Sequence, residues 1–164
     1  MTNFLEIEEA DRLLFFRYAW PAAAGCVQRA EITKDEVERV AGLIKSGIAP
    51  EEKYENLFKV PMAHMTVLAK GKNKIDKEII RGYFLFEHNE FAEDYCKTYF
   101  GTVMQIKEDH AFVETSLGIR EYRLDLVHAD VHETVIVHRG YVVEKVTEEV
   151  TAEINKLKEK YTKK

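Results

Sequence analysis

The stretch Thr134-Val-Ile-Val-His138-Arg-Gly-Tyr141 decides the fold of the second half of this chain. β-Branched residues dominate its first part and favour extended backbone, so the stretch predicts a strand over 134–138. Side chains alternate along a strand, which places Thr134, Ile136 and His138 on one face. Gly140 then breaks the run. We therefore expect His138 at a strand end, where a lone imidazole usually just satisfies its own hydrogen bonds.

Short apolar runs on both sides of this stretch predict the rest of a sheet. Between residues 119 and 127, apolar and charged residues alternate, as in a half-buried strand. A polar turn over 107–110 separates two further runs. The flanking strands are expected over 101–106, 111–115, 119–127 and 141–146. Several short strands at this spacing favour a small closed or partly open barrel, because closure hides the exposed sheet edges.

The residues before position 95 have a helical period instead. Thr33-Lys-Asp-Glu36 is a capping box and predicts a helix that Gly47 stops. Helices are also expected over 4–18 and 75–88, and a short one from Pro50, while Pro61 is expected to break the chain and residues 62–68 are ambiguous. A last helix should begin at Thr147, with an apolar stripe, acidic early turns and a lysine-rich end. The change of period predicts a domain boundary near residue 95.

Composition narrows the function classes. The chain carries 24 Lys and Arg against 29 Asp and Glu, a net charge of -5, which argues against a general nucleic-acid binder. Its apolar runs are shorter than the roughly 20 residues that a spanning helix needs, and its first residues contain neither a basic n-region nor an apolar h-region. We therefore expect a cytoplasmic protein. The sequence contains no Walker, Rossmann or HExxH pattern.

The cysteines and most histidines are expected to be structural. Cys26 and Cys96 form no CxxC, which argues against a zinc knuckle or a disulfide framework, and Cys26 is predicted to be a small buried hydrophobe. His64 lies among apolar residues and is expected to be a hydrogen-bonded core or boundary residue. Three more histidines near the predicted barrel match no recognised ligand spacing and are expected to be solvated loop residues: His110, His128 and His132.

Three pieces of the second half together resemble a known family. They read Cys96-Lys-Thr-Tyr-Phe-Gly101-Thr-Val, then Ala111-Phe-Val-Glu-Thr-Ser-Leu-Gly118-Ile-Arg120-Glu-Tyr-Arg-Leu124-Asp-Leu-Val127, then Val135-Ile-Val-His138-Arg-Gly140-Tyr-Val-Val-Glu-Lys-Val146 before an acidic helix. Their order and near spacing resemble the HypC/HupF family of NiFe hydrogenase maturation chaperones. The similarity runs from about Cys96 to Ile154, nearly the whole length of such a protein, and leaves the first 94 residues as a helical extension of unknown role.

The resemblance implies a fold, a function and a site. The implied fold is α+β: a mostly helical N-terminal domain, residues 1–94, followed by a small OB-like β-barrel with a C-terminal helix, residues 95–164. The implied function is a non-enzymatic chaperone that escorts an iron centre, Fe(CN)2CO, bound transiently, and works with a HypD-like scaffold protein and the hydrogenase large-subunit precursor. The family's cysteine and histidine fall on Cys96 and His138, the expected iron ligands. A thiolate suits low-valent iron, and an imidazole can complete its coordination.

Three other functions stay open at this point. The barrel could be a HypC-like protein-docking module that has lost iron binding, in which case client binding would survive substitution of Cys96. A Cys-His enzyme could use Cys96 as nucleophile and His138 as base, although no third orienting residue is evident. An oligonucleotide-binding barrel could stack bases on aromatic residues, but the net charge disfavours it.

Overall fold

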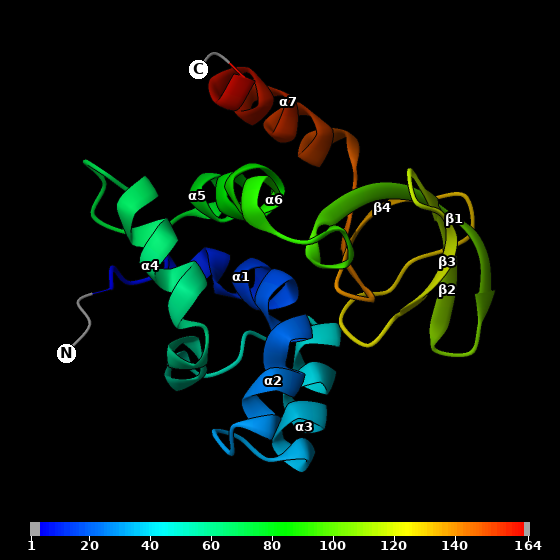
Figure 1. Cartoon of the computed structure of the whole chain (residues 1–164), viewed down its shortest axis with the longest axis horizontal. Coiled ribbons are helices and arrows are strands. Elements are labelled where there is room, and N and C mark those ends of the chain that lie inside the picture. The colour runs from blue at the N-terminus through cyan, green and yellow to red at the C-terminus, as the bar shows by residue number, and fades with distance from the viewer. Residues whose placement is uncertain (1–3, 163–164) are drawn as a thin grey trace.

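The computed structural model describes residues 4–162, with side chains over 4–161. It has the expected α+β architecture: helices first, then a small barrel, then a C-terminal helix (Figure 1). Met1–Asn3, where we looked for a leader sequence, lie outside the described residues, as do Lys163 and Lys164 of the predicted lysine-rich end. Within residues 4–162, no helix is both long and apolar enough to cross a bilayer.

The helical half begins with residues that satisfy their own helix ends. Thr33 Oγ1 accepts a hydrogen bond from the Glu36 amide at 3.1 Å, which confirms the predicted cap. Asp76 caps another helix by accepting from the Ile79 amide at 3.1 Å. The helices are α1 (Arg12–Ala19), α2 (Ala23–Gln28), α3 (Lys34–Lys45), α4 (Lys59–Leu68), α5 (Lys77–Gly82) and α6 (His88–Phe91), with 3-10 turns at Glu9–Asp11, Trp20–Ala22, Glu52–Leu57 and Asp94–Cys96 and a π-helical turn at Tyr83–Glu87.

Two local predictions for this half were wrong. The helix expected over 4–18 begins only at Arg12, because Ile7 forms a parallel bridge with Ile75. Pro61 does not break the chain but lies in the first turn of α4, where its missing N–H costs nothing because first-turn amides have no partner inside the helix. The ambiguous residues 62–68 are therefore helical.

In the described part of the chain, five strands close into a barrel. They are β1 (Thr98–Lys107), β2 (His110–Thr115), β3 (Gly118–Arg123), β4 (Thr134–His138) and β5 (Tyr141–Lys145), hydrogen-bonded in the order β1-β2-β3-β5-β4. Only β3 and β5 pair in parallel among these strands, and the Greek-key path with closure back to β1 is OB-like. The third strand ends at Arg123, earlier than the predicted 127.

The β4–β5 turn fixes the end of the stretch that decided the fold. Arg139 has φ 51° and Gly140 has φ 87°, the two left-handed residues that a tight two-residue hairpin requires. Glycine adopts this conformation freely, whereas Arg139 is held in it. The turn places His138 at the barrel end that faces the helices.

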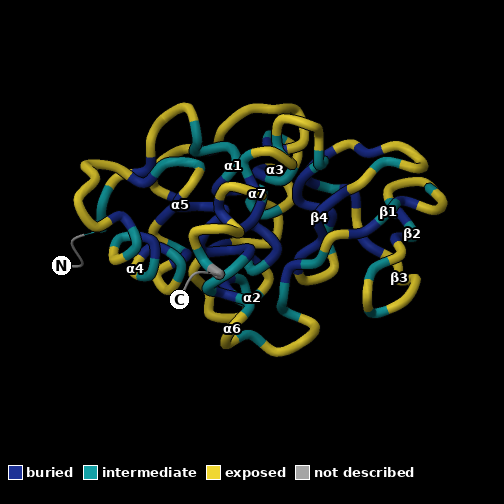
Figure 2. The backbone as a smooth tube through the Cα atoms, turned by 90° about the horizontal axis from the view of Figure 1, so that it is seen from above, coloured by how far each residue is buried: buried dark blue, intermediate teal, exposed yellow. Residues whose placement is uncertain are grey.

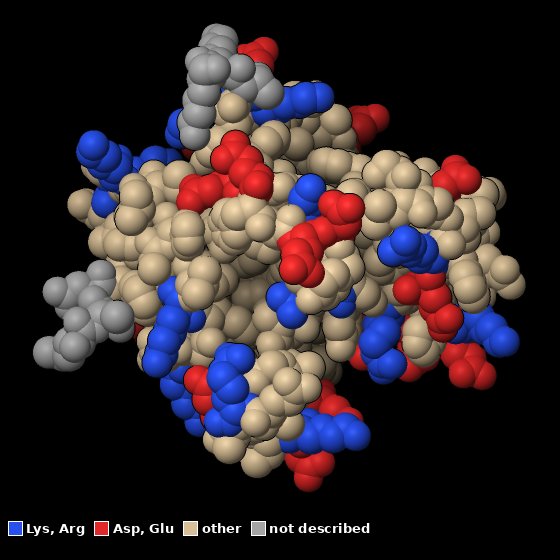
Figure 3. All heavy atoms as spheres, in the orientation of Figure 1, with Lys and Arg blue, Asp and Glu red and all other residues tan. Residues whose placement is uncertain are grey.

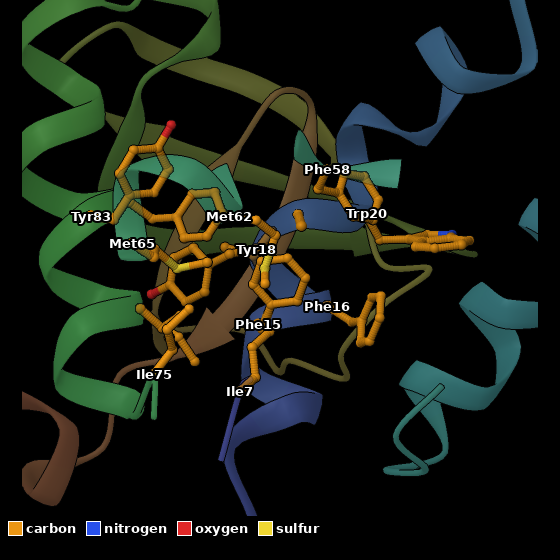
Figure 4. Close-up of a cluster of buried hydrophobic side chains, with 14 of the residues drawn as sticks. Ile7, Phe15, Phe16, Tyr18, Trp20, Phe58, Met62, Met65, Ile75 and Tyr83 are labelled. Atoms are coloured by element: carbon orange, nitrogen blue, oxygen red, sulfur yellow. The ribbon is translucent and has the colours of Figure 1, made fainter. Parts of the chain in front are cut away.

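The helical half and the barrel share one core. Aromatic and aliphatic side chains from α1, α4 and the π-helical turn converge around Phe15, Tyr18 and Tyr83 (Figure 4). Leu126, Ile136 and Val143 of the barrel half belong to the same cluster, and a second cluster fills the barrel itself. β4 is accordingly buried along most of its length, between the helices and the other strands (Figure 2).

The C-terminal helix α7 (Glu148–Thr162) lies against α5 of the helical half (Figure 1). Lys77 Nζ and Glu153 Oε1 are 2.5 Å apart, and the rings of Phe86 and Tyr161 stack at a centroid distance of 5.1 Å. The sequence boundary near residue 95 stays a prediction, but packing between the two halves is extensive.

Candidate functional site

Cys96 lies where the helical half passes into the barrel. It ends the 3-10 turn Asp94–Cys96, and its amide donates to the Glu93 carbonyl at 2.8 Å. Its thiol is free and partly exposed. The neighbouring Tyr95 hydroxyl interacts with this thiol, which raises the pKa of Tyr95. An accessible thiol at a chain crossover can meet a ligand from solvent.

The sheet register brings Cys96 and His138 together. His138 pairs with Thr98 across β1 and β4, so only Lys97 separates Cys96 from the residue opposite the histidine. The Cys96 backbone is close enough to the imidazole to influence its pKa. The two residues that the sequence selected are therefore neighbours in space, one partly exposed and the other only 3% exposed.

The hydrogen bonds of His138 define its protonation. Nδ1 lies 2.8 Å from the Tyr18 carbonyl oxygen of α1, and because a carbonyl only accepts, Nδ1 carries the hydrogen and donates. Nε2 is then left with a bare lone pair. It is buried and has no hydrogen-bond partner within the described residues.

Burial keeps this imidazole neutral. Desolvation, and then the neighbouring His88, lower the pKa of His138 to about 3. The His88 ring is perpendicular to that of His138, with centroids 5.2 Å apart, and burial lowers the pKa of His88 as well. A neutral imidazole that donates Nδ1–H to a carbonyl is how proteins often orient a histidine for metal binding through Nε2.

The position of the His138 ring depends on a buried ion network. Tyr18, whose carbonyl holds His138, also donates its hydroxyl to Glu144 Oε1 of β5 at 2.6 Å. Arg81 of α5 donates to the same carboxylate, with Nη2 2.6 Å from Oε2, and also pairs with Glu153 of α7. The network thus links α1, α5, β5 and α7. The sequence gave no signal for it, since its members lie up to 135 residues apart.

Cys26, to which the sequence assigned no chemistry, lies closer to His138 than expected. Its thiol is 1% exposed, as predicted for a small buried hydrophobe, and burial raises its pKa. It lines a cavity that His88 and His138 also line. Arg29 Nη2 is 3.5 Å from its sulfur. A segment rich in small residues was the only hint in the sequence that the chain packs closely here.

The remaining histidines take structural or surface positions. His64 Nδ1 lies 2.7 Å from Glu87 Oε1 at the surface of α4, which confirms the predicted boundary role. His128 and His132 are exposed in the loop before β4, as predicted, whereas His110 begins β2 beside Asp109. No group of three or more His, Cys, Asp or Glu side chains within residues 4–162 is arranged to hold a metal ion. Cys96 and His138 therefore offer two ligands at most.

The surface charge agrees with the sequence expectation about nucleic acid. On the face shown in Figure 3, basic and acidic side chains are interspersed over the barrel as well as over the helices, without a basic stripe. Compared with protein-family models, with curated proteins and with solved structures, the chain matches none of them.

Proposed function

We propose that this chain is a hydrogenase maturation chaperone of the HypC type, a carrier of an iron cargo rather than an enzyme. One observation carries the proposal: the β1–β4 register sets the accessible Cys96 thiol beside a neutral imidazole with a bare Nε2. The Cys96 thiolate is the first ligand that the cargo meets, and His138 is the second.

The small ligand count fits such a cargo. Fe(CN)2CO arrives with three diatomic ligands of its own, so a carrier needs to supply only one or two more. A two-residue site binds more weakly than a closed three- or four-residue site, which suits transfer to a HypD-like scaffold protein or to the large-subunit precursor. The OB-like barrel agrees with the fold that the resemblance implies.

The cargo is tested by infrared spectroscopy of protein purified without oxygen after co-expression with a HypD-like scaffold protein. We expect cyanide and carbon monoxide stretching bands on the wild-type chain, loss of these bands in Cys96→Ser, and their retention in the matched control Cys26→Ser. Thermal unfolding of each variant controls for folding. Undiminished bands in Cys96→Ser would rule out the proposed ligand.

Protein docking without iron is the second candidate, because the barrel half exposes large apolar side chains. Phe100 of β1 is 48% exposed and Ile119 of β3 is 57% exposed. Such residues often mark interaction sites. Under this reading the large-subunit precursor binds the Cys96→Ser variant as tightly as the wild type, and Phe100→Ser loses the precursor in a native-gel shift. Precursor binding that disappears with Cys96→Ser favours the iron carrier.

The Cys-His enzyme is the weakest of the expected alternatives. A general base works best when its pKa lies near the working pH. Burial holds the pKa of His138 at about 3, so the imidazole takes a proton from a thiol poorly. Its Nδ1–H also donates to a backbone carbonyl rather than to an orienting carboxylate.

A further inference from the structure

We propose that the cavity between the helical half and the β4–β5 turn binds a small organic anion with an apolar body. This inference does not depend on the iron cargo. The cavity has a volume of about 590 Å³, within the roughly 300–1,000 Å³ typical of small-molecule sites. Such sites occur preferentially where two structural units meet, as the helices and the barrel meet here.

The walls of the cavity are apolar and its edge is unusually so. Phe58 and Phe84 line it from the helical half and are buried. Val60 and Phe91 also line it, yet they are 60% and 55% exposed. Large apolar side chains left in water beside a cavity gain from covering by an apolar ligand. The body of the ligand is therefore hydrophobic.

The charge of the lining selects an anion. Lys59, Arg29 and Arg139 contribute three cationic side chains. Glu31 is the one acidic residue of the lining, and it is already paired with Arg29, whose Nε lies 2.6 Å from Glu31 Oε1. Among the described residues, Lys59 and Arg139 have no acidic partner within 4 Å. Two cations at the edge of an apolar cavity favour a carboxylate, sulfonate or phosphate group on the ligand.

His138 adds a third requirement. It lines the cavity, is 3% exposed, and carries on Nε2 a lone pair with no partner among the described residues. A buried acceptor without a donor costs free energy, which a ligand N–H or O–H would recover. The ligand therefore combines an apolar body, one anionic group and one hydrogen-bond donor.

A fluorescent probe with these three features tests the proposal. The dye 8-anilinonaphthalene-1-sulfonate has an aromatic body, a sulfonate and one N–H, and N-phenyl-1-naphthylamine has the same body and N–H without the sulfonate. We expect saturable binding of the sulfonated dye at one site per folded chain, and binding of the neutral dye weaker by roughly fivefold or more. Absence of saturable binding by the sulfonated dye would overturn the proposal.

Two pairs of variants locate the site. Ala22→Phe fills the cavity and should abolish binding of both dyes, whereas Ala24→Phe, on the exposed side of the same helix, should bind them as the wild type does. Arg139→Asn should weaken the sulfonated dye roughly fivefold and leave the neutral dye unchanged. Asparagine tolerates the left-handed backbone at φ 51°, so this variant keeps the turn. Sulfonated-dye binding that is unaffected by both Ala22→Phe and Arg139→Asn would place the dye elsewhere and refute the assignment.

The same assay separates this proposal from the iron carrier. Cys96 does not line the cavity, so Cys96→Ser should bind both dyes with wild-type affinity while it loses the infrared bands. Loss of dye binding in Cys96→Ser would contradict a separate cavity site. Wild-type protein that binds the dye but never carries the bands would leave the cavity intact and remove only the iron proposal.

Discussion

Lowering the pH from 7 to 5 should destabilise this protein by about 2 kcal/mol through His138 alone. Burial lowers the pKa of His138 from the 6.5 of an ordinary imidazole to about 3 in the folded chain. Between these two values the unfolded chain takes up a proton and the folded chain does not, so the free energy of unfolding falls as the pH falls. Each pH unit below 6.5 costs about 1.4 kcal/mol, and pH 5 lies about 1.5 units below it.

The groups that face His138 all oppose its protonation or leave it little help. His88 and Arg139 disfavour a second positive charge, and only the backbone contacts to Tyr18 and Cys96 favour it. Full protonation of the folded chain is therefore expected only near pH 3, where the accumulated cost reaches about 5 kcal/mol. A cost of that size is comparable with the whole stability of many small domains.

Urea unfolding at pH 7 and pH 5 measures the effect. His138→Asn keeps a side-chain N–H that can reach the Tyr18 carbonyl but cannot titrate, so it should lose about 2 kcal/mol less than the wild type over this range. The matched control, His132→Asn, removes an exposed imidazole whose φ of 75° suits asparagine, and should retain the wild-type dependence. If His138→Asn and the wild type lose equal stability, the burial argument is refuted.

Three further changes test the packing. Arg81→Met leaves the buried Glu144 carboxylate without its cation and should lower the free energy of unfolding by about 3–5 kcal/mol, while adding Glu144→Leu should restore part of it; urea unfolding of both variants measures this, and a loss below 1 kcal/mol in the single variant would contradict it. Gly101→Ala would place a Cβ 2.5 Å from the nearest atom of β2 and should cost about 1–3 kcal/mol, whereas Gly42→Ala, with nothing within 4 Å, should stabilise α3 by about 0.5–1 kcal/mol; thermal unfolding compares them, and equal shifts would be inconsistent with the barrel packing. The buried Cys26 thiol should react with iodoacetamide far more slowly in native protein than in urea, by mass spectrometry, and equal rates would show that the cavity wall opens readily.

Local sequence signals predicted the fold class because each one acts through nearby backbone. The Thr33 hydroxyl is three residues from the amide that it caps, and the β-branched run over 134–138 favours a strand in any context. Pro61 shows the limit of such signals. A proline interrupts a helix in its interior but fits the first turn, and only the actual start of α4 at Lys59 decides between the two.

The surroundings of the candidate site could not be predicted, since they come from contacts between distant segments. The motif placed His138 at a strand end, but its burial follows from the helical half packing over that end. Cys26 lies 112 residues before His138 and shares a cavity with it. The resemblance covers only residues after about 95, so it carried no information about side chains that the helical half contributes.

The helical half is therefore part of the candidate site and not an addition to it. Tyr18 holds the Nδ1–H of His138 through its carbonyl, and its hydroxyl is held in turn by Glu144, which Arg81 neutralises. Without these helices the imidazole would lose the partner that leaves Nε2 bare, and Ile136 would lose the core cluster that it packs in. Both proposals require a neutral Nε2 lone pair at the barrel's end. Both consequently require the intact chain, and an isolated barrel should have neither property.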